Sequence, residues 1–403
     1  MKPLQATSEG SRATAAATEE FSLVLGGPLY QLLLKARLVR PPLELVHRRM
    51  LVIPALAWVP LLLLTLMEGK ALDGVGVPFL FDIEAYARFL IAMPILILSE
   101  LVVHRQLREI VPQFRDHDIV PAASTSQFHD AITGAVRWRN SRVAEIALLA
   151  IVFLLGPWTW QHGLALQTDT WYASVGSGSI DLTPAGWWFI YISAPMFQFL
   201  LLRWYFRLAI WWRFLWQVSR LPLELKAAHP DRAGGLGFLG ESVYAFMPVL
   251  LAQGVVVSGI IASRVLTGAR SAFEFGGEIG VLVILLVAMI IVPLLFFAPD
   301  LIAARRNGLR KYDALASTYV RAFEHKWLEG KPPAAEPLLG SADIQSLADL
   351  ASSSDIVRVM WPIPFDLRTF IQVVVVTSAP FFPLVLTVIP FAELLQRVAE
   401  MVL

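Results

Sequence analysis

The sequence from residue 229 to residue 266 is HPDRAGGLGFLGESVYAFMPVLLAQGVVVSGIIASRVL. Its first part is rich in glycine and charge, whereas the part that begins at Glu241 is apolar as far as about Leu266. An apolar run of this length can cross the hydrocarbon core of a bilayer as a helix. The stretch therefore predicts a membrane-spanning helix that is entered from a glycine-rich turn.

The turn before this helix has two open interpretations. Proline pushes the preceding His229 out of the helical region, Asp231 is a turn former, and the glycines permit positive φ. Such a turn at a helix N-terminus can hold an anion on its backbone N–H groups, although the Lys-Ser/Thr ending of a phosphate-binding loop is absent. It is either a tight turn at the membrane surface or a ligand, anion or gate site. The residues of that candidate site are His229, Asp231, Arg232, Gly234, Gly235 and Gly237.

Three segments of the second half carry a resemblance. HPDRAGGLGFL (229–239), YDALA (312–316) and LLGSADIQSLADL (338–350) together resemble a family of uncharacterised bacterial multi-pass membrane proteins. The resemblance covers roughly half of the chain. It implies a location in the bacterial inner membrane, and it brings no activity, cofactor or site residue with it.

Composition places the chain in the membrane class. Of its 403 residues, 56% are hydrophobic and 16% are charged, against about 25% charged in soluble domains. There is no cysteine, which excludes disulfides, cysteine metal ligands and a cysteine nucleophile. The net charge of +1 does not indicate nucleic-acid binding, because the basic residues flank apolar runs. The first apolar run begins near Leu51, which is too late for a cleavable signal peptide.

Hydropathy and charge divide the chain into five regions. We expect a disordered tail at 1–20, an interfacial amphipathic helix at 21–50, a six-span bundle at 51–304 with a helical cytosolic loop at 104–142, a cytosolic helical insert at 305–365, and a C-terminal apolar segment at 366–403. The expected spans are 51–67, 86–103, 144–160, 184–220, 241–263, 278–299 and 370–391. The fold class is thus all-α, a polytopic membrane protein with about seven transmembrane helices and cytosolic helical extensions.

Two of these spans have unusual features. The fourth is about 36 residues long, or about 54 Å as a helix, which exceeds the roughly 30 Å bilayer core, so its second half must leave the membrane. The last run contains Pro380, Pro383 and Pro390, so it either crosses the bilayer or dips in and returns. Six spans plus a re-entrant segment is therefore the alternative to seven.

Charge asymmetry sets the expected orientation. The loop after the first span carries four carboxylates and one lysine, whereas the segment after the second span is rich in arginine. Basic residues favour the cytoplasmic side, so the N-terminus should be cytoplasmic. Tryptophans around the next loop predict an aromatic belt on the outer side. They are Trp158, Trp160, Trp171, Trp187 and Trp188.

Ionisable residues in spans are costly and are functional candidates. Glu100, with His104 one turn further on, could relay protons or bind a cation, or the two could form an interfacial i,i+4 pair. Arg203, Arg207 and Arg213 in the fourth span form a cationic strip. This strip either lines an anion path or lipid headgroup site, or it anchors the helix at the interface. We expect no metal site, cofactor or catalytic residue, because no metal-binding or catalytic motif is present.

Three functions remain open, and the sequence does not decide whether the chain is an enzyme. The spans contain proline and almost no charge at their middles, which favours a homo-oligomeric channel or passive permeation protein for an ion or small solute. Gln253 and Ser258 suit a pore wall, and the small residues beside them equally suit helix packing. One alternative is a membrane-embedded enzyme that acts on a lipid or phosphate headgroup at 229–232, and the other is a non-catalytic sensor or scaffold subunit. The expected partners are the lipid bilayer and further copies of the chain.

Overall fold

The computed structural model describes residues 21–40, 43–163, 170–175, 180–266, 272–329 and 342–386. These residues are nearly all helical, and six of the helices are long and apolar enough to cross a membrane. The six are Val46–Met67, Ile83–Asp116, Pro184–Val218, Gly237–Leu266, Gly276–Trp327 and Leu367–Leu384. The prediction of a multi-pass helical membrane protein is therefore confirmed. The tail expected at 1–20 lies outside the described residues.

Short 3₁₀ and π-helical segments join the longer helices. The first half of the chain forms α2 (Pro28–Lys35), α3 (Val46–Met67), η1 (Phe79–Phe81), α4 (Ile83–Ala85), η2 (Tyr86–Ala92), α5 (Met93–Asp116), η3 (Ala122–Ser124), α6 (Thr125–Arg139), α7 (Arg142–Gly163), β1 (Ala173–Val175), β2 (Ile180–Leu182), α8 (Pro184–Trp188) and η4 (Phe189–Ser193). The second half forms α9 (Ala194–Val218), η5 (Gly237–Gly240), α10 (Glu241–Leu266), η6 (Ala272–Phe275), α11 (Gly276–Ile291), η7 (Val292–Phe297), α12 (Ala298–Trp327), α13 (Ala342–Arg358), α14 (Leu367–Ser378), η8 (Ala379–Phe381) and α15 (Phe382–Leu386).

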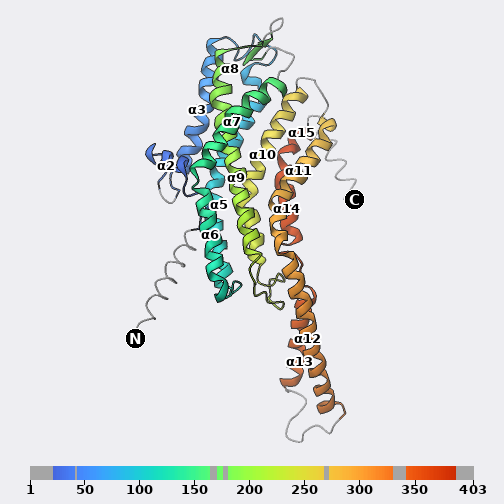
Figure 1. The fold of residues 1–403 in the computed structure, drawn as a ribbon. Coiled ribbons are helices and arrows are strands. Elements are labelled where there is room, and N and C mark those ends of the chain that lie inside the picture. The colour runs from blue at the N-terminus through green and yellow to red at the C-terminus, as the bar shows by residue number, and fades with distance from the viewer. Residues whose placement is uncertain are drawn as a thin grey trace, which may run out of the picture.

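The long helices run side by side as one bundle (Figure 1). Helix α10 packs against α5 on one side and α14 on the other, and α9 packs against α6 and α7. One end of the bundle carries α8 and the short strands, and we call it the hairpin end. The opposite end carries α6 and the projecting α12–α13 pair, and we call it the basic end.

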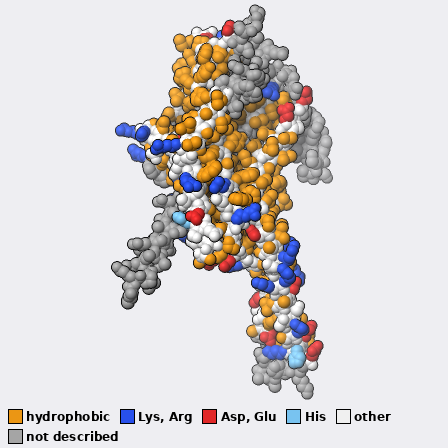
Figure 2. Space-filling model, in the orientation of Figure 1, with side chains coloured by type: hydrophobic (Ala, Val, Ile, Leu, Met, Phe, Trp, Pro, Cys, Tyr) orange, Lys and Arg blue, Asp and Glu red, His pale blue; other side chains and the backbone are white. Residues whose placement is uncertain are grey.

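The outer faces of the bundle helices are apolar. Large hydrophobic side chains stand exposed on them, including Leu51, Leu56 and Leu63 of α3, Ile146 and Leu154 of α7, and Ile284 and Leu285 of α11. Figure 2 shows this surface as a continuous hydrophobic zone, with lysine and arginine gathered towards the basic end. In water such an area would be costly, so it is the surface that faces lipid.

Several of the continuous helices are longer than the roughly 30 Å bilayer core, and two of them bear on the predicted spans. The fourth expected span is observed as the continuous helix Pro184–Val218 of 35 residues, as predicted. The sixth continues through η7 into α12, giving Gly276–Trp327 of 52 residues, or about 78 Å at 1.5 Å per residue. Its second half leaves the bundle and pairs with α13 as an arm (Figure 1). This part of α12 is the first half of the helical insert expected at 305–365.

The segment expected as one interfacial helix over 21–50 is divided in the structure. Only Pro28–Lys35 is a separate helix, and Val46 already begins α3. Residues 21–27 are irregular, and Phe21, Leu23 and Val24 are buried among the bundle helices. Gly26 and Gly27, both at positive φ, together with Pro28 turn the chain out of the bundle and open α2.

The hairpin end differs from the expected loop in two ways. Strands β1 and β2 pair antiparallel, with Ser174 opposite Asp181. Trp171 was predicted to stand in an aromatic belt, but it is 1% exposed, because its ring packs edge-on against Phe79 and its Nε1 donates to Asp82 at 2.9 Å. Trp187 is exposed, as a belt requires. The side chains of Trp158 and Trp160 lie outside the described residues.

Two expected spans stay incompletely described. The span at 144–160 lies within α7, of which the last residues have only their backbone described. The last run forms α14, then a 3₁₀ turn that contains Pro380, then α15 as far as Leu386. Residues 387–403 lie outside the described part, so the choice between a seventh span and a re-entrant segment stays a prediction.

Candidate functional site

Asp231 organises the glycine-rich turn at the basic end. Its carboxylate accepts hydrogen bonds from the backbone N–H groups of Ala233 at 2.8 Å, Gly235 at 3.1 and 3.2 Å, and Gly237 at 2.8 Å. His229 Nδ1 lies 2.8 Å from the same carboxylate. Burial alone would raise the pKa of Asp231, but these hydrogen bonds outweigh it and hold that pKa below its usual value. The backbone N–H groups of the turn thus bind the chain's own carboxylate.

The turn is also a packing junction. Arg232, Gly234 and Gly235 all have positive φ, and a Cβ at Gly234 would lie 3.0 Å from Met360 and 3.3 Å from Leu225. The carbonyl of Arg232 accepts a hydrogen bond from the N–H of Trp361 at 2.7 Å. These contacts tie the turn to the segment that follows α13, which favours a structural turn over a ligand site or gate.

A buried group of ionised side chains lies deeper in the bundle, and we call it the arginine cluster. Glu100 of α5 accepts hydrogen bonds from Arg49 of α3 and from Arg207 of α9, the latter at 2.9 Å, and it lies 3.7 Å from Arg203 of α9. Arg203 also lies 3.5 Å from Glu145 of α7. The cluster, defined as Arg49, Glu100, Glu145, Arg203 and Arg207, therefore joins four helices.

The contacts in the arginine cluster differ from the groupings that were predicted for these site residues. Glu100 and His104 do not form a pair, because Glu100 binds arginines while His104 Nδ1 lies 2.9 Å from the hydroxyl of Ser22. The cationic strip is also divided. Arg203 and Arg207 point into the bundle to carboxylates, whereas Arg213 lies over the ring of Trp138 at 4.9 Å.

The buried N-terminal segment is held by the same charged residues. Arg139 Nη1 donates to the carbonyl of Ser22 at 2.5 Å, and Arg203 Nη2 donates to the carbonyl of Gly26 at 3.4 Å. The N–H of Leu29 donates to Glu145 at 2.8 Å. Irregular backbone at membrane depth needs such partners, since lipid offers none. The segment 21–29 is thus fixed to α6, α7 and α9.

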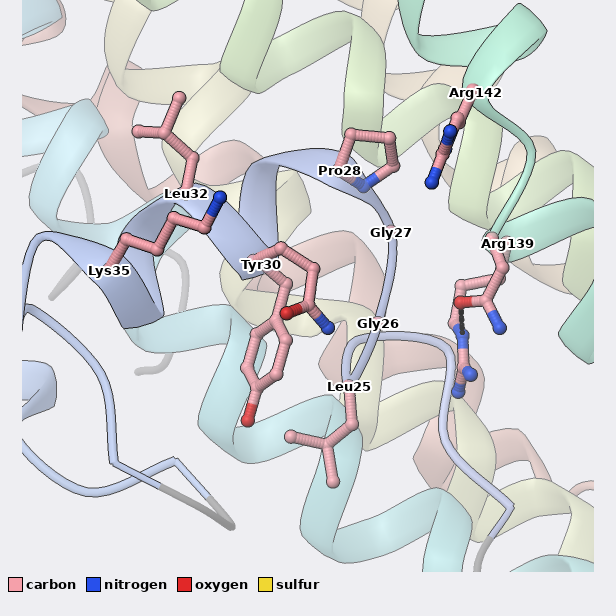
Figure 3. Close-up of a pocket in the computed structure, with 11 residues that line it drawn as sticks. Leu25, Gly26, Gly27, Pro28, Tyr30, Leu32, Lys35, Arg139 and Arg142 are labelled. Carbon is pink, nitrogen blue, oxygen red and sulfur yellow. Dashed lines mark hydrogen bonds between the residues drawn. The ribbon is translucent and has the colours of Figure 1, made fainter.

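A pocket of about 720 Å³ opens between this segment and the α6–α7 turn, and we call it the α2 pocket. Its lining is Leu25, Gly26, Gly27, Pro28, Tyr30, Gln31, Leu32, Lys35, Arg139, Asn140 and Arg142. Figure 3 shows Arg139 and Arg142 on one side of the glycine turn, and Tyr30, Leu32 and Lys35 on the other. Among the described residues, the lining thus carries three cations and no carboxylate.

Two features of the α2 pocket bear on its chemistry. Burial and then repulsion from Arg207 lower the pKa of Arg139 to about 10, which leaves this guanidinium charged at neutral pH. Leu32 stands exposed beside the pocket, and α2 projects sideways from the bundle (Figure 1). The site therefore combines a positive potential with an apolar border.

The neutral polar residues expected to suit a pore are engaged in helix packing. Tyr205 donates to Gln253 Oε1 at 2.6 Å, and Ser258 donates to the carbonyl of Pro380 at 2.6 Å. A Cβ at Gly254 would lie 2.9 Å from the carbonyl oxygen of Thr377. These contacts seat α10 against its neighbours and favour the packing interpretation of these residues.

Within the described ranges, no group of three or more His, Asp or Glu side chains is placed to hold a metal ion. Comparison of the chain with protein-family models, with curated proteins and with solved structures finds no match. The resemblance carried by 229–239, 312–316 and 338–350 therefore stays a prediction.

Sequence reasoning missed Arg49, Glu145 and the α2 pocket. In the sequence, Arg49 lies directly before the first apolar run and Glu145 lies at the start of the third, so each has the position of an ordinary flanking residue. The available signal was that charged residues occur at the same level of several spans, namely near the basic ends of 51–67, 86–103, 144–160 and 184–220. Isolated charges at one depth on adjacent helices need partners, and they find them in each other.

Proposed function

We propose that the chain is a multi-pass protein of the bacterial inner membrane, with its basic end in the cytosol, that binds the headgroup of an anionic phospholipid in the α2 pocket. The observation that carries the proposal is the pocket lining, in which three cations meet no carboxylate beside a lipid-facing helix. The inner-membrane location follows from the resemblance described above.

The charge distribution supports the orientation. The basic end carries the arginines in the second half of α5 and those of α6 and α12, whereas Glu68, Asp73 and Asp82 lie towards the hairpin end. Short basic segments beside spans stay in the cytoplasm. In the proposed orientation the α2 pocket lies at the inner leaflet, where anionic lipids attract basic residues by about 1 kcal/mol for each Lys or Arg.

The lining suits a phosphodiester with attached glycerol. Arg142 presents a planar guanidinium that matches phosphate oxygens, and Lys35 adds a point charge from the other side. Arg139, whose Nη1 and Nε already donate to Ser22 and Asn140, adds positive charge. Leu25, Leu32 and Pro28 provide apolar contact for the first carbons of the acyl chains. The groups present bind and orient, so we propose a binding function rather than catalysis.

The two other functions, a channel and a membrane-embedded enzyme, have less support. Gln253 and Ser258 are engaged in packing, and Asp231 is held by the turn that it organises. Assembly into a homo-oligomer stays a prediction, as does the scaffold alternative.

Lipid binding can be measured by thermal shift and by native mass spectrometry of detergent-purified protein. Phosphatidylglycerol should stabilise the chain more than phosphatidylcholine does. Lys35→Gln and Arg142→Gln should each weaken phosphatidylglycerol binding about fivefold, and the double variant about thirtyfold, because each lost charge is worth about 1 kcal/mol. Arg139 is left intact because it also holds the N-terminal segment.

Arg306→Gln is the matched control. Arg306 lies exposed on α12, and its loss removes one positive charge away from the pocket. Equal weakening in this control, or unchanged binding in the double variant, would disprove the proposal. A parallel measurement with inorganic phosphate identifies the source of the ligand. Stabilisation by phosphate as strong as by lipid would point to a soluble phosphate compound.

A further inference from the structure

The arginine cluster carries an excess of buried positive charge. Three guanidinium groups, those of Arg49, Arg203 and Arg207, face two carboxylates, those of Glu100 and Glu145. None of these side chains is more than 9% exposed. A buried charge without a counter-charge is costly, so the cluster as built favours one further negative charge.

The donors for such a charge are present on Arg49. Its Nη1 binds Glu100, whereas its Nε and Nη2 are buried and have no hydrogen-bond partner among the described residues. These two nitrogens share one edge of the planar guanidinium, and that edge is the fork with which arginine binds anions. Arg207 repeats the pattern, since its Nη2 binds the other oxygen of Glu100 and its Nη1 is buried without a partner. Burying such donors without acceptors is costly.

We propose that the cluster binds a small inorganic monovalent anion, of the size of chloride or nitrate, on the open edge of Arg49. One such anion would bring the cluster to neutrality and would satisfy donors that no group in the described part of the chain reaches. The site is distinct from the α2 pocket, whose lining includes neither Arg49 nor Arg207. A phospholipid headgroup therefore does not account for these donors.

The bound anion would act on the fold. Glu100 and its arginines join α3, α5 and α9, and Arg203 extends the network through Glu145 to α7 and the N-terminal segment. Neutralising the cluster removes the repulsion among its three cations. The anion should therefore stabilise the association of these helices with each other.

The test uses full-length protein in a neutral detergent free of anionic lipid. Chloride, bromide or nitrate replaces gluconate at constant ionic strength while thermal stability is recorded, and equilibrium dialysis with radioactive chloride gives the stoichiometry. We expect saturable stabilisation and one anion per chain. Absence of saturable chloride and nitrate binding by the wild-type protein would overturn the proposal, whatever the variants do.

Two substitutions of the same chemical kind localise the site. Arg49→Lys keeps the charge and the reach to Glu100 but removes the Nε–Nη2 edge, and it should weaken anion binding at least about tenfold. Arg203→Lys is the control, because none of the buried donors without partners belongs to Arg203, and it should change binding by less than about threefold. Because both substitutions keep the positive charge, equal loss in both variants would assign the effect to a general disturbance of the cluster and reject the Nε–Nη2 edge of Arg49 as the site.

Should Arg49→Lys not fold, Arg207→Lys removes the third donor and serves in its place. The outcome is separable from that of the lipid experiment. Lys35→Gln and Arg142→Gln should leave chloride binding unchanged, and Arg49→Lys should leave phosphatidylglycerol binding unchanged.

Discussion

At the scale of single residues, loss of the Asp231 carboxylate should destabilise the glycine-rich turn. Asp231→Asn keeps the size of the side chain, but it replaces a carboxylate that accepts three backbone N–H groups by an amide with one acceptor oxygen. We expect a loss of about 2 kcal/mol, since hydrogen bonds to a charged group exceed neutral ones. Thermal unfolding in detergent measures it. Asp130→Asn, at an exposed position of α6, should leave stability unchanged.

The same carboxylate predicts an acid dependence. The hydrogen bonds hold the folded-state pKa of Asp231 below its unfolded value of about 3.9. The stabilisation that the Asp231 carboxylate gives to the folded state is therefore fully present above the unfolded-state pKa. It is lost as pH falls through the folded-state pKa. Wild-type protein should lose stability below about pH 4 more steeply than Asp231→Asn does. Parallel stability curves for the two proteins would contradict this assignment.

The sequence could identify individual charged residues but not their partners. Arg203, Arg207 and Arg213 look alike as a strip on one helix, yet two of them bind carboxylates and the third lies over Trp138. The difference depends on Glu100 and Glu145, which belong to other helices. Helical periodicity places a side chain on a face, and only the packing of helices decides what that face meets.

At the scale of elements, the N-terminal segment depends on Arg139. Arg139→Gln removes the donor to the carbonyl of Ser22, which then stays buried without that partner at a cost of about 1–3 kcal/mol. We expect faster amide hydrogen exchange over 21–29, with little change in α10. Arg137→Gln, on the exposed face of the same helix, is the control for loss of charge. Unchanged exchange over 21–29 would show that apolar burial alone holds the segment.

The α12–α13 arm offers a second test at this scale. Asp343 at the start of α13 accepts from Lys326 Nζ at 2.8 Å and from Trp327 Nε1 at 2.9 Å, and these bonds hold the pKa of Asp343 below its usual value. Asp343→Asn should speed exchange across α13 and leave the bundle unaffected. Asp355→Asn, further along the same helix, is the matched control. Equal effects of the two variants would assign no special role to the contact at Asp343.

Helices were predictable where apolar length alone decides, as for α3, α10 and the long 184–218 helix. The irregular conformation of residues 21–27 was not predictable in this way. Its leucines and phenylalanine suggest an amphipathic helix, but the double glycine at 26–27 and the arginine partners allow these side chains to be buried inside the bundle instead. The strands and the burial of Trp171 depend in the same way on tertiary contacts, which local pattern does not contain.

At the scale of the whole molecule, the proposed orientation follows from charge and can be tested directly, because the chain has no cysteine. Single cysteines can be introduced at Ala314 on the arm and at Asp73 near the hairpin end, because both positions are exposed. With the basic end in the cytosol, a membrane-impermeant maleimide added to intact cells should label Asp73→Cys and not Ala314→Cys. The reverse pattern would move the α2 pocket to the outer leaflet, where the lipid proposal loses its electrostatic support.

The same reagent decides the number of spans. Helices α3, α5, α7, α9, α10, α11 and α14 all lie in the bundle (Figure 1), and seven crossings that begin inside end outside. A cysteine at Leu403 should then be labelled in intact cells as fast as Asp73→Cys. Protection until the membrane is permeabilised would mean that the segment after Pro380 returns to the cytosol. In that case the exposed apolar side chains of α14, such as Ile371 and Val375, would line a half-depth insertion rather than a full crossing.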